Sequence, residues 1–418
     1  MRSAPAHLIA DLREHAFAAA EGQRRVGAEV ELIAVDAETR RPAPIEARAG
    51  STERATLDVL RAHGQGEGWR EERSAKSGVP EFCTPDGGRI TFEPGGQIEF
   101  SAAPVRSLTR LGKTLGTVVP ALRAALADAG IDTLTMGLDP VNRVEDVAMQ
   151  LPGDRYARMA RHYASIGTEG ARMMRQTASI QVCIDSGTEP LDRWRLLNAL
   201  SPYVVAIFAN SPIYDGETTG YQSTRRRIWG ALDPARTGAF ADGGGGGDAI
   251  RRYADFACGA AAILLGDNHP PFASFGEWAE RGVTLDTWHE HLTTLFPEVR
   301  PRGYFEVRSC DALPPEWYVA PLTFIAGLAY GPDGGRTALE IAGPPDAEAL
   351  DRAGRCGLYD PALADRAAQL YSLALRECAS LGDAFVNDET LDRAREYFDR
   401  FTRLRRSPAS ELLASVGA

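Results

Sequence analysis

The sequence lacks any pair of cysteines in the C-x-x-C spacing, because its six cysteines are scattered along the chain. This pattern excludes a zinc site built on that motif. Long apolar runs are also absent. No stretch reaches the ~18 residues that a membrane span needs, and residues 1–22 form an amphipathic pattern without the apolar segment of a secretory signal. We therefore expect a reducing, cytoplasmic location and no membrane partner.

Basic residues are fewer than acidic residues. Lys and Arg total 46 against 57 Asp and Glu, and the resulting formal net charge of −11 argues against nucleic acid as a general partner. With 44% hydrophobic and 25% charged residues, the chain has the composition of a globular protein. No internal repeat and no clear linker divides it, so we expect one domain over residues 1–418 with a mainly helical part from about 340.

A phosphate-binding P-loop is missing as well. The five-glycine run Gly243–Gly247 is not followed by Lys and Ser or Thr, so we expect a flexible surface loop there. His289 and His291 lie in an expected polar helix over 284–295, but residues two apart do not share a helical face. The two histidines are therefore not expected to form a metal pair.

The most informative segment that is present is the turn in Phe92–Pro104. Glu93 and Glu99 stand on either side of a Pro-Gly-Gly sequence. Glycine permits unusual backbone angles and close approach of a ligand, and proline fixes one torsion of the turn. A surface hairpin with two solvated glutamates would have the same sequence. A buried turn lined by acids would suit Mg²⁺, which prefers hard oxygen ligands.

Three further segments alternate like amphipathic strands, over 26–35, 179–185 and 304–311. In each, side chains on one face are apolar and those on the other are polar, as in a sheet that packs on helices with one face only. An acidic face of this kind requires cations to relieve repulsion. The residues alone therefore predict a Mg-nucleotide enzyme on an antiparallel sheet, with these polar residues on its open face: Glu29, Glu31, Glu93, Glu99, Gln181, Asp185, Glu306 and Arg308.

Helical periodicity and punctuation by Pro and Gly predict the remaining elements. The region 36–90 is polar and shows one helix only. The expected helices span residues 5–20, 53–63, 105–129, 155–165, 191–209, 249–266, 284–295, 316–330, 361–381 and 388–404.

An arginine-rich segment follows the fifth of these helices. It contains Arg225, Arg226, Arg227, Trp229 and Arg236. Guanidinium groups bind carboxylates and phosphates through two parallel hydrogen bonds, so we expect an anion-binding loop here. A solvated basic turn is the alternative.

Together these motifs resemble the glutamate–cysteine ligase family, in the form found in plants and many bacteria and in relatives that serve ergothioneine synthesis. The resemblance extends over about residues 25–330. It rests on these segments, which occur in the family's order: Gly27–Glu31, Glu93–Glu99 with Ser101–Pro104, Arg175–Thr177, Gln181–Asp185, Phe208–Pro212, Arg225–Trp229, Arg236–Gly238, and Tyr304–Arg308 with Asp311.

The resemblance implies an α+β, glutamine-synthetase-like fold with a curved antiparallel sheet that forms an active-site bowl inside helices. It also implies ATP-dependent joining of the γ-carboxylate of L-glutamate to the amine of L-cysteine, through a γ-glutamyl phosphate. Such chemistry relies on positioning and charge neutralisation, and no protein nucleophile is needed.

Roles follow from the resemblance residue by residue. Two or more Mg²⁺ ions bridging the ATP phosphates would be held by Glu29, Glu31, Glu93, Glu99 and Glu306. Arg308 would stabilise the transferring phosphoryl group, beside Glu93 and Glu306. Substrate carboxylate, phosphate or amide contacts would come from Arg225, Arg236, Gln181, Asn210 and, as a weaker candidate, Arg175.

The chain departs from the family pattern near the expected substrate pocket. Arg226 and Arg227 stand where members often carry Ser-His, Gly230–Leu232 replaces an acidic loop, and Ser309-Cys310 replaces Gly-Ala. A different amine acceptor therefore stays open, as do a catalytically silent binding homologue, a guanidino kinase, the pathway (glutathione, ergothioneine or specialised) and the oligomeric state. We expect Glu93→Gln and Glu306→Gln to fold normally and to lose ATP turnover.

Overall fold

The computed structural model describes residues 3–20, 22–47, 54–74, 77–238, 248–267 and 269–416. Within them, nine strands form one antiparallel sheet in the order β10-β11-β7-β1-β5-β4-β3-β2, and β6 pairs with the far end of β1. A small hairpin of β8 (Ile213–Tyr214) and β9 (Glu217–Thr218) lies apart. The strands of the large sheet are β1 (Val26–Asp36), β2 (Arg70–Arg73), β3 (Pro80–Cys83), β4 (Arg89–Phe92), β5 (Ile98–Val105), β6 (Ile131–Leu134), β7 (Ser179–Asp185), β10 (Val299–Pro301) and β11 (Tyr304–Asp311).

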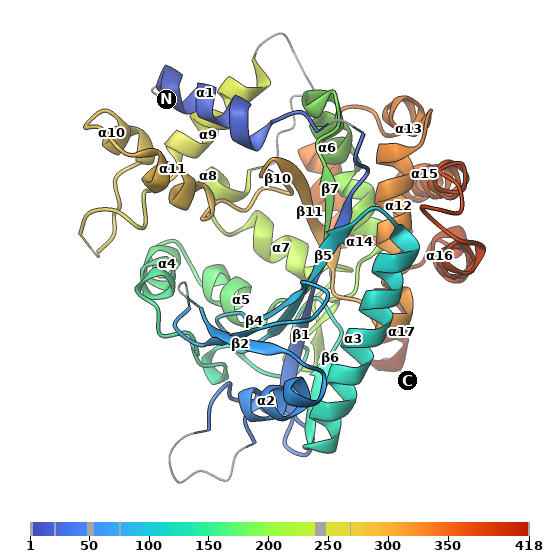
Figure 1. Cartoon of the computed structure of the whole chain (residues 1–418), viewed down its shortest axis with the longest axis horizontal. Helices are drawn as coiled ribbons and strands as arrows, with labels where there is room; N and C mark the ends of the chain where they lie inside the picture. Colours follow the sequence, from blue (N-terminus) through green and yellow to red (C-terminus); the bar gives the residue numbers. More distant parts are fainter. Residues whose placement is uncertain are drawn as a thin grey trace.

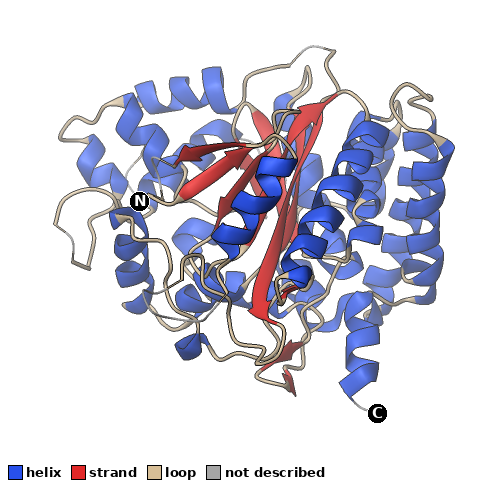
Figure 2. Cartoon of the chain, turned by 60° about the horizontal axis from the view of Figure 1, so that its bottom comes forward, coloured by secondary structure: helices blue, strands red, loops and turns tan. Residues whose placement is uncertain are grey.

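One face of the sheet is apolar, as the alternation in the sequence predicts. Val26, Ala28, Val30 and Leu32 of β1 are buried in the main core. That core also contains residues of α3 (Leu108–Asp128), α6 (Pro190–Ile207) and α12 (Val319–Tyr330). The strands therefore run between two groups of helices, as Figure 2 shows.

The opposite, polar face of the sheet lies toward a smaller apolar cluster. Met159, Met173, Met174 and Trp229 belong to it. They come from α4 (Asp154–Ala164), α5 (Glu169–Gln176) and α7 (Thr224–Gly230), which Figure 1 shows on the side away from α12. The space between this cluster and the sheet contains the candidate site.

The chain is almost entirely helical after β11. Helices α15 and α16 stack outside α12 (Figure 1). None of the helices in the described ranges is long and apolar enough to cross a membrane. The helical elements of this part are η3 (Pro315–Trp317), α12, α13 (Gly334–Ala342), α14 (Ala347–Cys356), η4 (Gly357–Tyr359), α15 (Pro361–Ala379), α16 (Asp388–Arg400), η5 (Thr402–Leu404) and α17 (Pro408–Val416).

The other helices lie along the N-terminal and middle parts of the chain. The first begins as an α-helix and ends as a π-helical turn, η1. These elements are α1 (Ala6–Asp11), η1 (Leu12–Ala16), α2 (Thr56–Gly66), η2 (Val144–Asp146), α8 (Pro234–Thr237), α9 (Ala249–Gly259), α10 (Phe275–Ala279) and α11 (Leu285–Leu292).

Some sequence predictions differ from the structure. Strands β2, β3, β4 and β6 were not predicted, because each has four residues and is too short to show a period. The arginine-rich segment is the helix α7 and not a loop, since the Ser223 hydroxyl accepts a hydrogen bond from the Arg226 amide and caps its start. The loop predicted at Gly243–Gly247 lies outside the described residues.

Candidate active site

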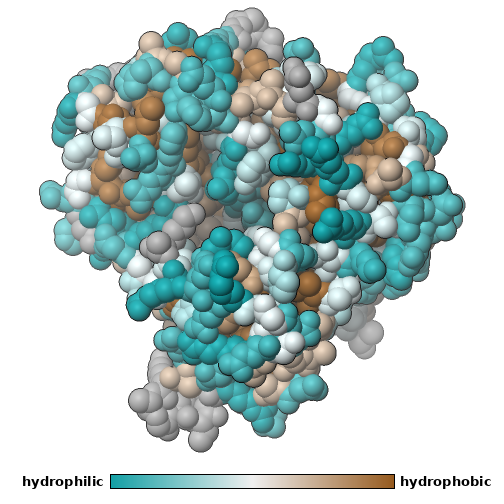
Figure 3. All heavy atoms as spheres, viewed as in Figure 1, coloured by the Kyte–Doolittle hydropathy of each residue, from teal (hydrophilic) through white to brown (hydrophobic). Residues whose placement is uncertain are grey.

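A cavity of about 700 Å³ lies over the polar face of the sheet. Polar residues cover most of the molecular face shown in Figure 3, and that face is hollowed near its centre. The residues that line the cavity and carry its chemistry are Glu29, Glu31, Glu93, Glu99, Gln181, Arg225, Arg300, Arg302 and Arg308.

Three carboxylates gather on one side of this cavity. Glu31 and Glu99 are direct partners across β1 and β5, and Glu93 joins them from the turn before β5. One carboxylate oxygen from each lies within 4.8 Å of the other two. Withdrawal from water, followed by repulsion within the acidic group, raises the pKa of Glu93 well above its usual range and also raises that of Glu99.

Hydroxyl groups on β4, β5 and β7 hold two of these carboxylates in place. The hydroxyls of Thr91 and Ser101 donate to Glu99 Oε1 at 3.2 and 2.9 Å. Ser179 Oγ donates to Glu31 Oε2 at 3.0 Å. These bonds fix the orientation of the carboxylates but supply no positive charge, so the repulsion between them persists.

The turn that carries Glu93 is fixed by a close backbone packing. A Cβ on Gly95 would lie 2.1 Å from the carbonyl oxygen of Arg175, so only glycine fits there. Gly96 has a φ of 92°, which glycine adopts without strain. Gln150 then binds the turn, because its Nε2 donates to the Gly95 carbonyl at 2.8 Å.

Glu29 and Glu306, the other two glutamates of the site, differ in their surroundings. Glu29, Glu306 and Cys183 form a second close group, also within 4.8 Å. Burial, then the charges of Glu99 and Glu306, raise the pKa of Glu29 to about 8. Burial would also raise the pKa of Glu306, but nearby arginines, Arg300 first, outweigh it and lower that pKa to about 2.

Three arginines form ion pairs with Glu306. Its side chain is 0% exposed. Arg300 and Arg308 each approach Glu306 Oε2 at 2.7 Å, and Arg302 Nη1 donates to Oε1 at 3.4 Å. Arg308 also donates to the side-chain oxygen of Gln181. Glu306 therefore already has cationic partners, whereas within the described parts of the chain Glu31, Glu93 and Glu99 have none at ion-pair distance.

Arg225 closes the cavity from α7. Its guanidinium lies 4.4 Å from the ring centre of Trp229 and donates to the carbonyl of Arg308 at 3.0 Å. Among the described residues, the Nε atoms of Arg225, Arg300 and Arg308 are buried without a hydrogen-bond partner. Buried donors of this kind fit an anionic ligand.

Not every residue singled out in the sequence reaches the cavity. Asn210 donates to the carbonyls of Thr135 and Ala312, both at 2.8 Å, and so joins loops behind the sheet. Asn210 does not line the cavity, and neither do Arg175 and Arg236. All three side chains have the geometry of structural residues.

Each of these two arginines is bound to the protein itself. Arg175 donates to the carbonyl of Val147 at 2.7 Å. Arg236 is fully buried, and its Nη1 donates to the hydroxyl of Thr294 at 2.7 Å while its Nε pairs with Asp233 at 3.3 Å. Neither guanidinium is therefore placed to contact a substrate in the cavity.

The departures from the family pattern at 226 and 227 also lie outside the cavity lining. Arg226 points toward α14, where its Nη2 pairs with Asp351 at 2.8 Å and its Nη1 lies 3.6 Å from Glu298. Arg227 pairs with Glu169 at 3.3 Å. Neither arginine is therefore part of the cavity wall.

Sequence reasoning missed two arginines and the apolar wall of the site. Arg300 and Arg302 flank Pro301 just before Gly303 and β11, and this pattern of alternation followed by glycine signals a hairpin. The wall opposite the sheet is formed by Tyr156, Met159, Met173, Met174, Trp229 and Phe296. Nothing in their local sequence distinguishes them from ordinary core residues.

The arrangement is suited to a cation and an anion together. Three carboxylates without cationic partners offer the hard oxygen ligands that Mg²⁺ prefers. Beside them, partner-free guanidinium nitrogens offer donors to phosphate or carboxylate oxygens. Magnesium ions and a phosphorylated substrate therefore fit the residues that are present.

Comparison with known proteins agrees with this chemistry. Residues 25–399 match the model of glutamate–cysteine ligase family 2, GCS2. The chain is 36% identical over 369 residues to the glutamate–cysteine ligase EgtA of Mycolicibacterium smegmatis, which covers 84% of this chain and 82% of that protein. It is 32% identical over 270 residues to the chloroplastic glutamate–cysteine ligase of Brassica juncea, covering 60% of this chain and 52% of the plant protein.

A solved structure shares the fold. The glutamate–cysteine ligase of Francisella tularensis, in complex with AMP, matches with a TM-score of 0.55 at 12% identity over 95% of this chain and 86% of the other. This likeness confirms the predicted glutamine-synthetase-like α+β fold. With the family match over most of its length, the chain belongs to glutamate–cysteine ligase family 2 and is a ligase.

Proposed function

We propose that the protein joins the γ-carboxylate of L-glutamate to the amine of L-cysteine at the expense of ATP, giving γ-glutamylcysteine, ADP and phosphate. The observation that carries this proposal is the cavity in which Glu31, Glu93 and Glu99 meet, with no ion-pair partner among the described residues, close to the guanidiniums of Arg225 and Arg308. A ligase needs both kinds of group, because the phosphates and the carboxylate that must meet are all negatively charged.

In the first step, a γ-carboxylate oxygen of glutamate attacks the terminal phosphorus of ATP and ADP leaves. Arg308 is the residue proposed to stabilise the transferring phosphoryl group, because Glu306 and Gln181 hold its guanidinium at the floor of the cavity. Arg225 and Gln181 are proposed to bind glutamate, and both line the cavity.

The five glutamates proposed to hold magnesium do not serve equally. Among the described residues, Glu31, Glu93 and Glu99 form no ion pair, whereas Glu306 is paired with three arginines. Arg225 and Arg308 lie near enough to oppose the rise in the pKa of Glu31. Glu29 belongs to the group that contains Glu306. We assign the metal-binding role chiefly to the first three and an arginine-positioning role to Glu306. Bound Mg²⁺ would supply the positive charge that draws phosphate oxygens to these carboxylates.

In the second step, the neutral amine nitrogen attacks the acyl carbon of γ-glutamyl phosphate and the C–O bond to phosphate breaks. The nitrogen then gives up one proton, which the departing phosphate or water takes up. The amine is itself the nucleophile, so this route needs no nucleophilic side chain of the protein. Its apolar wall, which includes Met173 and Phe296, excludes water from the acyl phosphate and so limits hydrolysis.

The experiment that tests this function is phosphate release from Mg-ATP and L-glutamate, with each amino acid added in turn and the products identified by mass spectrometry. The proposal predicts turnover with cysteine and a product with the mass of γ-glutamylcysteine. Turnover with another amine alone would overturn the assigned acceptor. No turnover with any amine would overturn the proposal and favour a silent binding homologue.

A further inference from the structure

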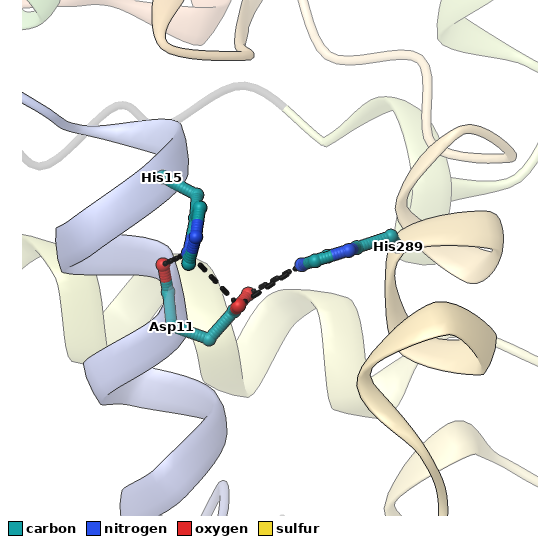
Figure 4. A group of neighbouring side chains, drawn as sticks. All are labelled: Asp11, His15 and His289. Carbon is teal, nitrogen blue, oxygen red and sulfur yellow. Dashed lines mark hydrogen bonds and ion pairs between the residues drawn. The ribbon is translucent and has the colours of Figure 1, made fainter.

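The cavity of the candidate active site is called the acidic cavity below. Outside it, three potential metal ligands meet at the junction of α1, η1 and α11. Asp11 ends α1, His15 lies in η1, and His289 comes from α11 (Figure 4). His289 Nε2 lies 2.9 Å from Asp11 Oδ1, and His15 Nδ1 lies 3.1 Å from the same oxygen. Residues 278 positions apart in the chain thus converge on one carboxylate.

We propose that Asp11, His15 and His289 bind one transition-metal ion of the zinc class, separate from the magnesium sites of the reaction. Two imidazoles and a carboxylate are a ligand set that such ions prefer to Mg²⁺. This proposal does not rest on the proposed function.

The spacing of the ligand atoms supports the site. Tetrahedral zinc has bonds of about 2.0–2.1 Å to nitrogen and oxygen, so its ligands stand roughly 3.3 Å apart. The separations from Asp11 Oδ1 to the two histidine nitrogens, 2.9 and 3.1 Å, are close to that value. His15 Nδ1 also lies 3.1 Å from the Asp11 backbone carbonyl. A bound metal would replace that hydrogen bond and the one between His289 and the carboxylate, with a small outward shift of the rings.

The carboxylate is oriented by a neighbour that is not a ligand. Trp288 Nε1 donates to Asp11 Oδ2 at 3.1 Å. His289 Nε2 lies 2.9 Å from Oδ1 and 3.0 Å from Oδ2, and Oδ1 is the oxygen that also approaches His15. Metal sites commonly have such supporting hydrogen bonds. The Asp11 side chain is 3% exposed, whereas those of His15 and His289 are 61% and 45% exposed. The site is therefore anchored inside the protein and open to solvent, where a water can complete the coordination.

The π-helical turn accounts for the position of His15. The Phe17 amide donates to the Leu12 carbonyl at 2.8 Å, five residues back, and this widens the last turn. Single π-turns cost helix stability and occur frequently at functional sites. Here the widened turn carries His15 beside the Asp11 carboxylate.

The site adjoins the active-site arginines. The cavity at the cluster, about 350 Å³, is lined by Asp11, His15 and His289 together with Arg300 and Arg302, which also line the acidic cavity. Both guanidiniums pair with the Glu306 carboxylate, which offsets part of their charge. In addition, the Gly303 amide donates to the Ala16 carbonyl at 2.9 Å, so η1 contacts the β10–β11 turn directly.

Zinc titration by calorimetry tests the site, with Mg²⁺ present at saturating concentration to occupy the acidic cavity. We expect one tight Zn²⁺ per chain in the wild type. The affinity should fall about tenfold or more in His15→Gln and in His289→Gln, because each removes one of three ligands. His7→Gln is the matched control, since His7 is exposed on α1 and does not belong to the cluster.

Thermal unfolding and the spectrum of bound Co²⁺ test the site independently of calorimetry. At equal Zn²⁺ concentration, the thermal midpoint should rise in the wild type and in His7→Gln and rise less in the two ligand variants, since binding stabilises only the folded state. Co²⁺ should give the visible spectrum of a tetrahedral site with nitrogen ligands. Equal Zn²⁺ affinity in all four proteins, or no stoichiometric binding in the wild type, would overturn the proposal and leave a plain ion-pair cluster.

Discussion

Glu31 and Glu99 face each other directly across β1 and β5, with both carboxylates in the same cavity. Like charges placed directly opposite in a sheet oppose folding. The proposed Mg²⁺ site accounts for this pairing and predicts a conflict between stability and activity at these positions.

The first prediction concerns Glu99→Gln. Without Mg²⁺ the variant should be more stable than the wild type by up to about 1 kcal/mol, because one of two opposed charges is removed while Thr91 and Ser101 can still donate to the amide oxygen. Phosphate release should fall by about a hundredfold or more. Thermal unfolding and turnover measure the two effects, with the exposed Glu67→Gln as control. A variant that is active at the wild-type rate would refute the metal-ligand role.

The second prediction separates Glu93 from Glu306. Both neutral variants should lose ATP turnover, but only Glu306→Gln should lose stability, by about 3–5 kcal/mol, because Arg300, Arg302 and Arg308 would be left around a neutral group. Normal folding, expected from the sequence for both, therefore applies to Glu93→Gln. Urea unfolding of the two variants side by side measures this difference, and equal stability would contradict it.

The third prediction is a pH dependence of stability. The pKa of Glu29 is raised from 4.5 to about 8 in the folded protein, so between these values the folded state holds a proton that the unfolded chain releases. Without Mg²⁺ the free energy of unfolding should therefore decrease as pH rises from about 5 to about 8.

Denaturant titrations across that range measure the slope. Glu29→Gln should flatten it, and so should Mg²⁺, which favours the ionised carboxylates of the whole group. The shifts of Glu31, Glu93 and Glu99 have the same direction, so they add to the effect. A Mg²⁺-free protein whose stability rises with pH over this window would contradict the assignment.

The fourth prediction concerns the turn that carries Glu93. Gly95→Ala should cost about 2 kcal/mol or more, because the new Cβ would meet the Arg175 carbonyl at 2.1 Å. It should also weaken the response of turnover to Mg²⁺ by displacing Glu93. Gly116→Ala is the control: it lies in α3 with open space at the Cβ position, and should gain roughly 0.5–1 kcal/mol. Equal stability of the two variants would show that the turn tolerates a side chain.

The parts of the site that the sequence predicts are those with a local period. Glu29 and Glu31 stand on the polar face of β1, and Glu306 and Arg308 on that of β11, because a strand places alternate residues on one face. The exposed β2 carries no apolar alternation, and so it left no signal.

What the sequence could not show is which polar groups find partners inside the protein. Arg236 resembles an anion-binding residue in sequence, but its partner Thr294 lies 58 positions away and binds it in the core. Arg300 was missed for the opposite reason, since its role depends on Glu306 across the β10–β11 hairpin. Such contacts follow from the tertiary fold and not from local spacing.

In the proposed reaction, phosphorylation activates the γ-carboxylate of glutamate. The most direct test uses glutamate labelled with heavy oxygen in the γ-carboxylate, together with Mg-ATP and cysteine, and mass analysis of the phosphate released. If γ-glutamyl phosphate forms, one labelled oxygen passes from glutamate to phosphate and one stays in the amide product. Unlabelled phosphate accompanying labelled product would contradict the acyl phosphate route.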